Sequence, residues 1–258
     1  MAALMNVGVA GRTALRLGAA MATALLVGCA SMPEEKAPPV ITARYTAAPV
    51  QVDGVLDDAA WHQAVVYPLA LSAADLAEGK ALTESGEVRV AWDDQFIYVA
   101  VRFVDSDIVA EGEEDQLHHY RMGDVAEFFL KPADHTWYWE MYVTPAGRKT
   151  TLWFPGRGRL GLPSAETSPG GLRVAAQCQG TLNDWRDVDQ SWTAEMALPV
   201  SDMVARGESF GVGSHWTMML ARYNYGRYLD WKELSMAPAI SKTNYHLIED
   251  YATIDFVK

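Results

Sequence analysis

Residues 123–130 read GDVAEFFL and place two acids inside an otherwise apolar run. Two carboxylates this close could form a catalytic pair for glycoside hydrolysis, ligate a metal ion or accept hydrogen bonds from sugar hydroxyls. In a strand, Glu127 points to the same face as Val125 and Phe129, and Asp124 points to the opposite face. We therefore predict that the two acids do not act together: Glu127 contacts a ligand, whereas Asp124 braces the preceding loop or a cation.

Strand patterns dominate the rest of the chain. Residues 87–92 alternate apolar and polar side chains, residues 96–104 form a near-continuous apolar run, and residues 93–95 supply the turn of a hairpin. Turn residues separate such segments at a spacing of roughly 8–12 residues, which is typical of a sandwich. We predict an all-β fold, an antiparallel β-sandwich of the jelly-roll or immunoglobulin-like type with one or two short helices. The other strand-like segments are 124–131, 137–143, 148–154, 171–177, 191–198, 215–223, 228–234 and 252–257.

The first 28 residues are predicted to be a lipoprotein signal peptide. Arg12 and Arg16 precede an apolar stretch at 17–27, which is shorter than the ~20 residues that a membrane-spanning helix takes. Residues 26–29, LVGC, resemble the lipobox of bacterial lipoproteins, in which the cysteine, here Cys29, becomes lipidated. An ordinary cleaved signal peptide is the alternative.

The mature chain is predicted to consist of a tether and one domain. Residues 29–41 hold the lipidated Cys29 and a polar, proline-rich flexible segment, and residues 42–258 form the domain. Ala30 and Ser31, and not an aspartate, directly follow Cys29, which by analogy with bacterial lipoproteins favours the outer membrane of a Gram-negative bacterium. The expected location is therefore extracytoplasmic, with the membrane as a partner through the lipid anchor.

The charge and the cysteines exclude several classes of function. The formal net charge is −12, and it becomes −14 without the leader, which holds two of the 21 basic residues and none of the 33 acidic residues. A chain this acidic is not expected to bind nucleic acid and fits a neutral or cationic ligand, or calcium. Cys178 has no intramolecular partner if Cys29 carries lipid, and no zinc pattern is present.

Five motifs, taken in order, make the chain resemble the family 9 carbohydrate-binding modules, which have a DOMON-like β-sandwich. The resemblance covers about residues 42–257. It implies an antiparallel β-sandwich, structural calcium and saccharide binding without catalysis. The motifs are APVQVDGVLDDAAW (48–61), VRVAWDDQFIYVAVRFVD (88–105), GDVAEFFLKP (123–132), SWTAEMALPVSDM (191–203) and NYHLIEDYATIDF (244–256).

The resemblance assigns sugar-binding positions on the 124–131 strand and its neighbours. A glutamate of the family matches Glu127, whose carboxylate can accept hydrogen bonds from two sugar hydroxyls. The first of two sugar-stacking tryptophans of the family falls on Arg121, with Tyr120 beside it, and a sugar-binding arginine falls on Glu140. These departures weaken the inference about the ligand and leave the inference about the fold intact.

The second stacking position falls on Tyr245. With Asn244 and His246 beside it, Tyr245 could form one wall of a sugar site, or it could pack as a plug over the end of the sandwich. Trp192 and Trp231 both alternate with polar residues at strand spacing and are predicted to lie in the core.

A calcium site is predicted in the acidic loop before the opening motif. Asp105 and Asp107, together with Asp124 and the acids of 111–115, offer the hard oxygen ligands that calcium prefers. A solvated acidic loop without metal is the alternative.

The sequence thus favours non-catalytic binding of a saccharide or glycan at the cell envelope, in support of carbohydrate catabolism. Three alternatives stay open: a component of a glycoside hydrolase acting on O-glycosyl bonds, a haem or redox module of the DOMON type, and an envelope scaffold with a decayed sugar site. The protein partner, if any, is unknown.

Overall fold

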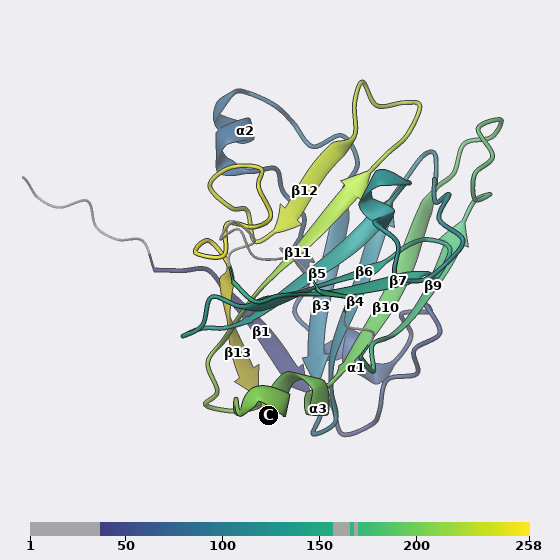
Figure 1. Cartoon of the computed structure of the whole chain (residues 1–258). Helices are drawn as coiled ribbons and strands as arrows, with labels where there is room; N and C mark the ends of the chain where they lie inside the picture. The colour runs from purple at the N-terminus through teal and green to yellow at the C-terminus, as the bar shows by residue number, and fades with distance from the viewer. Residues whose placement is uncertain (1–36, 157–165, 168–169) are drawn as a thin grey trace, which may run out of the picture. The chain divides into compact units, whose positions relative to one another are not determined.

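Strands run through the part of the chain that the computed structural model describes, which is residues 37–156, 166–167 and 170–258 (Figure 1). The predicted signal peptide, Cys29 and the first part of the tether lie outside the described residues. The first strand begins at Val40, two residues before the predicted domain boundary. The whole of 37–258 forms one compact unit.

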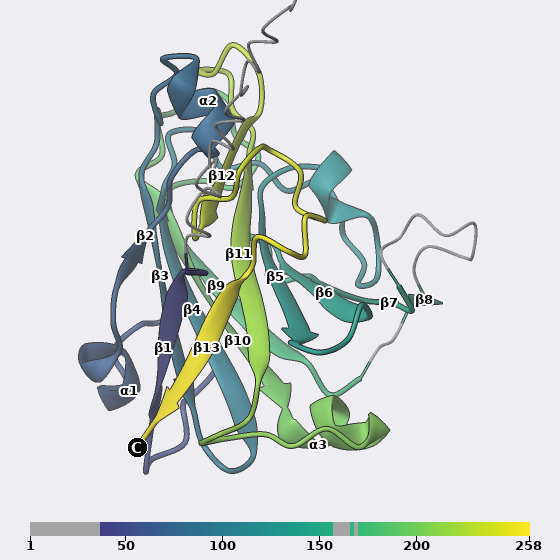
Figure 2. The same cartoon turned by 90° about the vertical axis from the view of Figure 1, so that its left-hand side faces the viewer.

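The strands form two layers, because one continuous sheet folds over on itself (Figure 2). The first layer carries the opening motif on β5. Its strands, in spatial order, are β8 (Glu166–Thr167), β7 (Lys149–Phe154), β6 (Tyr138–Val143), β5 (Val125–Pro132) and β11 (Trp216–Asn224), with β12 (Glu233–Ala237) also paired to β11.

The second layer contains the hairpin predicted around residues 93–95. Its strands, in spatial order, are β3 (Gly86–Trp92), β4 (Phe96–Val104), β10 (Ser191–Pro199) and β9 (Arg173–Gln179), with β2 (Tyr67–Pro68) beside β3. All of these pairs are antiparallel, as predicted.

Two strands at the ends of the domain join the layers, and here the pairing departs from the prediction. β1 (Val40–Tyr45) pairs in parallel with both β13 (Ala252–Val257) and β3, and β13 continues to β11. The all-β sandwich is confirmed, but it is mixed rather than purely antiparallel. Parallel pairing of β1 was not predictable from local turns, because its partners lie far away in the sequence.

The core lies between the layers and follows the period-two pattern of the strands. Ile97, Val99, Val101 and Phe103 of β4 face Phe128 and other apolar residues of the first layer. A second apolar cluster covers the outer face of the first layer, where residues 238–251 pack over β5, β6 and β11. This second cluster surrounds part of the outer face of the first layer with side chains.

Helices are short and peripheral. The α-helices are α1 (Ala59–Gln63), α2 (Ala73–Ala77) and α3 (Val200–Met203), and 3-10 turns occupy His119–Arg121 and Val204–Arg206. α1 packs on the outer face of the second layer through Trp61. None of the helices among the described residues is long and apolar enough to cross a membrane.

Candidate functional site

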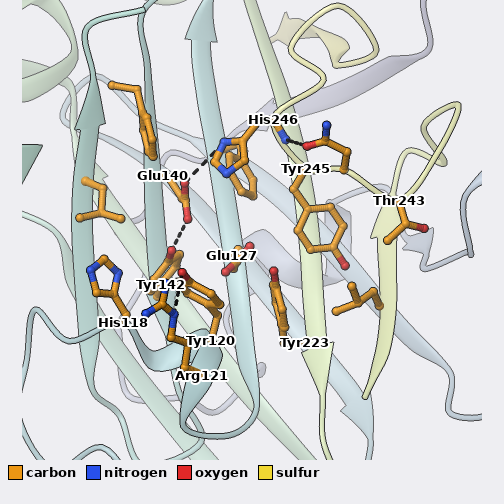
Figure 3. Close-up of a pocket in the computed structure, with 15 residues that line it drawn as sticks. His118, Tyr120, Arg121, Glu127, Glu140, Tyr142, Tyr223, Thr243, Tyr245 and His246 are labelled. Atoms are coloured by element: carbon orange, nitrogen blue, oxygen red, sulfur yellow. Dashed lines mark hydrogen bonds and ion pairs between the residues drawn. The ribbon is translucent and has the colours of Figure 1, made fainter. Parts of the chain in front are cut away.

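A pocket of about 590 Å³ lies on the outer face of the first layer, with Glu127 at its floor (Figure 3). We call it the Glu127 pocket. All seven residues predicted to bind sugar line it, although they come from three separate parts of the sequence. They are Tyr120, Arg121, Glu127, Glu140, Asn244, Tyr245 and His246, joined by His118, Phe129, Tyr142, Leu152, Phe154, Tyr223, Leu234 and Thr243.

Glu127 is the central acid of the pocket. The strand alternation predicted from the sequence is observed, because Val125 and Phe129 belong to the outer apolar cluster and Glu127 lies between them. Its side chain is 2% exposed, and among the described residues no group donates a hydrogen bond to its carboxyl. Burial and the neighbouring Glu140 raise the pKa of Glu127 well above its usual value, and Lys232 opposes this only in part.

Glu140 is the second acid of the pocket and comes from β6. Tyr142 lies opposite Glu127 in the strand register, and its hydroxyl donates a hydrogen bond to Oε1 of Glu140. Oε2 has no hydrogen-bond partner among the described residues and lies 3.9 Å from Nδ1 of His246. Burial raises the pKa of Glu140 to about 7, despite the hydrogen bond from Tyr142.

Tyrosine rings form much of the wall around the two acids. The ring centroid of Tyr120 lies 5.5 Å from that of Tyr223 and 6.3 Å from that of Tyr142, and the centroids of Tyr223 and Tyr245 lie 5.6 Å apart. Figure 3 shows these four rings around Glu127. Aromatic walls of this kind can stack on a sugar ring or hold a cation.

Tyr245 combines the two roles that the sequence left open. Its hydroxyl lies 3.0 Å from the carbonyl oxygen of Arg222 and 3.1 Å from that of Ser235, so the side chain is fixed as a plug. Its ring also lines the Glu127 pocket. The adjacent His246 shares a 2.7 Å hydrogen bond through Nδ1 with the hydroxyl of Tyr138, which holds the imidazole at the pocket wall.

The rim of the pocket comes from the 3-10 turn at His119–Arg121. Arg121 is exposed, and its Nε donates to the hydroxyl of Tyr120 at 3.0 Å. Gly123 lies just after this turn and has φ of +140°. A Cβ at this position would overlap the carbonyl oxygen of Val109. The glycine of the opening motif therefore lets the rim turn pass close to the loop before it.

Asp124 lies apart from the Glu127 pocket and is buried. Its Oδ1 accepts a hydrogen bond from the backbone N–H of Tyr225 at 2.6 Å, and its Oδ2 accepts from Val109 at 2.7 Å. It thus braces the preceding loop, one of the two roles predicted for it.

The predicted calcium ligands are engaged by donors. Oδ2 of Asp105 accepts from Arg222 at 3.0 Å, and Oδ2 of Asp107 accepts from the backbone N–H of Arg227 at 2.7 Å. Within the described part of the chain, no group of three or more His, Cys, Asp or Glu side chains could hold a metal ion. This arrangement does not favour calcium ligation by Asp105, Asp107 and Asp124, and calcium binding stays a prediction.

The structure corrects the placement of one tryptophan. Trp192 is buried in the core, as predicted, but Trp231 is 79% exposed, because β12 begins only at Glu233 and Trp231 lies in the loop before it. Trp231 lines a second pocket of about 540 Å³, which shares Leu234 and Thr243 with the Glu127 pocket.

Sequence reasoning missed several wall residues, chiefly Tyr142 and Tyr223. The strand alternation did contain a signal for Tyr142, because it lies two residues after Glu140 and so shares its face. Tyr223 had no such signal, since it joins the pocket only through the pairing of β11 with β5.

Comparisons with known proteins identify a family and a fold for the chain. A model described as carbohydrate family 9 binding domain-like matches residues 52–213. A Bacteroides uniformis protein proposed to bind carbohydrate is 16% identical, with a TM-score of 0.63 over 85% of this chain and 100% of that chain. A comparison with curated proteins found no match.

Two further solved structures are family 9 carbohydrate-binding modules from Caldicellulosiruptor kristjanssonii. The structure in complex with cellotriose is 14% identical, with a TM-score of 0.57 over 85% of this chain and 93% of that chain. The structure in complex with glucose is 13% identical, with a TM-score of 0.58 over 85% and 95%. At these identities the likeness shows a shared fold.

Proposed function

This chain belongs to the carbohydrate family 9 binding domain-like family, and from that premise we propose that it binds saccharides without catalysis in the Glu127 pocket. The observation that carries the proposal is the buried carboxyl of Glu127, which has no hydrogen-bond donor among the described residues and lies between tyrosine rings. A buried polar group without a partner is costly. Sugar hydroxyls would supply the missing donors, while the rings cover the apolar face of the sugar.

The structural neighbours support a saccharide as the class of ligand, because two of them are family 9 modules in complex with cellotriose and glucose. The sugar-binding role of the seven predicted residues stays a prediction. Their meeting in one pocket supports it, including the positions where Arg121 and Glu140 depart from the family pattern.

The two acids suit binding better than hydrolysis. Glycoside hydrolysis pairs a protonated carboxyl with an ionised one. Here burial raises the pKa of both Glu127 and Glu140, and no basic residue among the described ones forms an ion pair with Glu127. Among the described residues, no ion pair therefore holds Glu127 in the ionised form that a nucleophile or base requires.

Binding is testable on a glycan array with the full chain, purified in a detergent without a sugar headgroup. Wild-type protein is expected to retain one group of related saccharides, and Tyr223→Ala, which removes part of the aromatic wall, is expected to weaken that retention at least ten-fold. Glu113→Gln, an exposed residue outside the pocket, serves as the matched control. Retention of no saccharide would contradict the proposal.

We extend the proposal to the location of the protein: an extracytoplasmic, lipid-anchored position, with lipid on Cys29. The LVGC motif at 26–29 and the apolar stretch before it support this. Mass spectrometry of the membrane fraction should find a lipidated N-terminal cysteine, and Cys29→Ala should move the protein out of that fraction. Recovery of unmodified wild-type protein would contradict the anchor.

A further inference from the structure

Glu127 and Glu140 share one face of neighbouring strands. In the register of β5 and β6, Glu127 lies opposite Tyr142 and Glu140 lies opposite Phe129, so the two acids are diagonal neighbours. Diagonal neighbours of antiparallel strands lie about 7–8 Å apart and point to the same side of the sheet. Each acid is less than 5% exposed. Two like charges at this spacing repel each other strongly in a site shielded from water.

Among the described residues, little positive charge lies near enough to offset the pair. Lys232 lies over the ring of Tyr223, with Nζ 5.0 Å from the ring centroid, and only partly opposes the effect of burial on Glu127. Arg121 sits at the exposed rim, where its guanidinium lies 5.2 Å from the centre of the Tyr120 ring.

His246 forms an ion pair with Glu140 only when its imidazole is protonated, so it offsets one acid of the pair in that state alone. Nδ1 of His246 is 3.9 Å from Glu140, too far for a hydrogen bond, and already bonds the hydroxyl of Tyr138. His118 is exposed at the opposite wall. Among the described residues, Oε2 of Glu140 has no hydrogen-bond partner and no group donates to Glu127, so both acids lack donors that a ligand can supply.

The tyrosine wall favours a cation at the same place. Tyr120, Tyr142, Tyr223 and Tyr245 line the pocket around Glu127 (Figure 3). The face of an aromatic ring attracts a positive charge, and the attraction is strongest where water is excluded. Carboxyls at the floor and rings at the wall are together the features of a site for an ammonium group.

We infer that the Glu127 pocket selects saccharides with a free amino group, that is, 2-amino-2-deoxy sugars and their oligomers in the ammonium form. This inference rests on the proposed function and names its ligand class. The ammonium group lies between Glu127 and Glu140 and donates to their free oxygens, while the tyrosines cover the sugar ring. A neutral sugar also satisfies hydrogen bonds, but it brings no positive charge to offset the ionisation of either buried acid.

Ammonium binding also carries a proton signature. Burial and the neighbouring acid raise the pKa of Glu127, and burial raises the pKa of Glu140 to about 7, so without ligand both carboxyls retain a proton more readily than ordinary carboxyls do. The ammonium stabilises the ionised form, so the carboxyl releases a proton to the buffer when the sugar binds. A neutral sugar does not cause this release.

Isothermal titration calorimetry with glucosamine, glucose and N-acetylglucosamine tests the inference, since the three differ only at carbon 2. The full chain in a detergent without a sugar headgroup is titrated at pH 7 in two buffers of different ionisation enthalpy. Glucosamine should bind at least ten-fold more tightly than the other two, with a buffer-dependent enthalpy. If glucose or N-acetylglucosamine binds equally well or better, the inference is overturned and the proposed function stands. If no saccharide binds here or on the array, both fail.

Substitutions then locate the selectivity. Glu127→Gln and Glu140→Gln keep the shape of the side chain and remove the charge, so each should reduce the preference for glucosamine over glucose at least five-fold. Glu113→Gln makes the same change in net charge at an exposed site outside the pocket and should leave the preference unchanged. An unchanged preference in both pocket variants would overturn the assignment to these two acids, and far-ultraviolet circular dichroism verifies their fold.

Discussion

Arg222 and Asp105 form a buried ion pair that joins the two layers of the sandwich. Nη2 of Arg222, on β11 of the first layer, lies 3.0 Å from Oδ2 of Asp105, which directly follows β4 of the second layer. The Arg222 side chain is fully buried, and Nε1 of Trp192 donates to the same carboxylate oxygen at 3.1 Å. The acid predicted to ligate calcium thus holds the interior of the sandwich together.

Replacing Arg222 with methionine is expected to destabilise the protein by about 3–5 kcal/mol, because the change leaves Asp105 buried without its charge partner. Urea unfolding followed by tryptophan fluorescence measures the loss. Glu84→Gln is the control, since Glu84 lies farther from Arg222, at 3.6 Å, and should have a smaller effect. A loss below 1 kcal/mol in Arg222→Met would show that the pair does not stabilise the fold.

Glu195 fixes the segment that leads into α1. Its Oε2 accepts hydrogen bonds from the backbone N–H groups of Asp53 and Gly54 at 2.9 and 2.8 Å, and its Oε1 accepts from Nε1 of Trp61 at 2.7 Å. Glu195→Ala is expected to cost about 2–4 kcal/mol in the free energy of unfolding, because three donors lose their acceptor at once.

Glu195→Gln provides the graded comparison, since it keeps one acceptor oxygen and should lose less than Glu195→Ala. Thermal unfolding of the wild type and the two variants gives the order. Equal stability of Glu195→Ala and the wild type would mean that water replaces the carboxylate without cost.

Local patterns account for most of what the sequence could predict about the fold. The β3–β4 and β5–β6 hairpins and the face of Glu127 follow from period-two alternation and from turns of a few residues. Trp231 shows the limit of the same reasoning. It alternates with polar neighbours at strand spacing, yet the strand begins only at Glu233. A pattern cannot show where pairing stops.

Long-range pairing accounts for what the sequence could not predict about the site. Tyr223 reaches the Glu127 pocket because β11 lies beside β5 with Ala221 opposite Glu127, a pairing between residues almost one hundred positions apart. The family resemblance did place Tyr245 beside the acid. It could not show that the Tyr245 hydroxyl would bond Arg222 and Ser235 and so hold the ring at the wall.

Stability is expected to fall as the pH rises from 5 to 8, and Glu140 is one cause. Its pKa is about 7 in the folded protein against 4.5 ordinarily, so the folded state binds more protons than the unfolded state in this window. The proton that the folded carboxyl retains stabilises the folded state, and this contribution is lost as the carboxyl ionises. The expected loss in the free energy of unfolding is on the order of 1–3 kcal/mol for a buried group. Glu127 acts in the same direction.

Urea unfolding at pH 5, 6, 7 and 8 measures this slope. Glu140→Gln should flatten it, because the glutamine carries no proton to lose, whereas Glu113→Gln at an exposed site should not. If stability depends on pH with the same slope in the wild type and in Glu140→Gln, the Glu140 carboxyl has the same pKa in the folded and unfolded states.

Trp231 is expected to affect the binding of long saccharides and not the stability of the fold. Its side chain is 79% exposed, so Trp231→Ala should change the free energy of unfolding by less than about 0.5 kcal/mol. The second pocket, which Trp231 lines, adjoins the Glu127 pocket through Leu234 and Thr243. A sugar chain that starts in the Glu127 pocket can therefore continue over the tryptophan ring.

Titration of a monosaccharide and of its tetrasaccharide into Trp231→Ala separates the two effects. The tetrasaccharide should bind about 3–10-fold more weakly than to the wild type, as expected for the loss of one aromatic stack of about 0.5–1.5 kcal/mol. The monosaccharide should bind as before. Trp185→Ala is the matched control, because Trp185 is 71% exposed and lines neither pocket. An equal loss for both ligands, or no loss for the tetrasaccharide, would confine binding to the Glu127 pocket and leave Trp231 without a part in it.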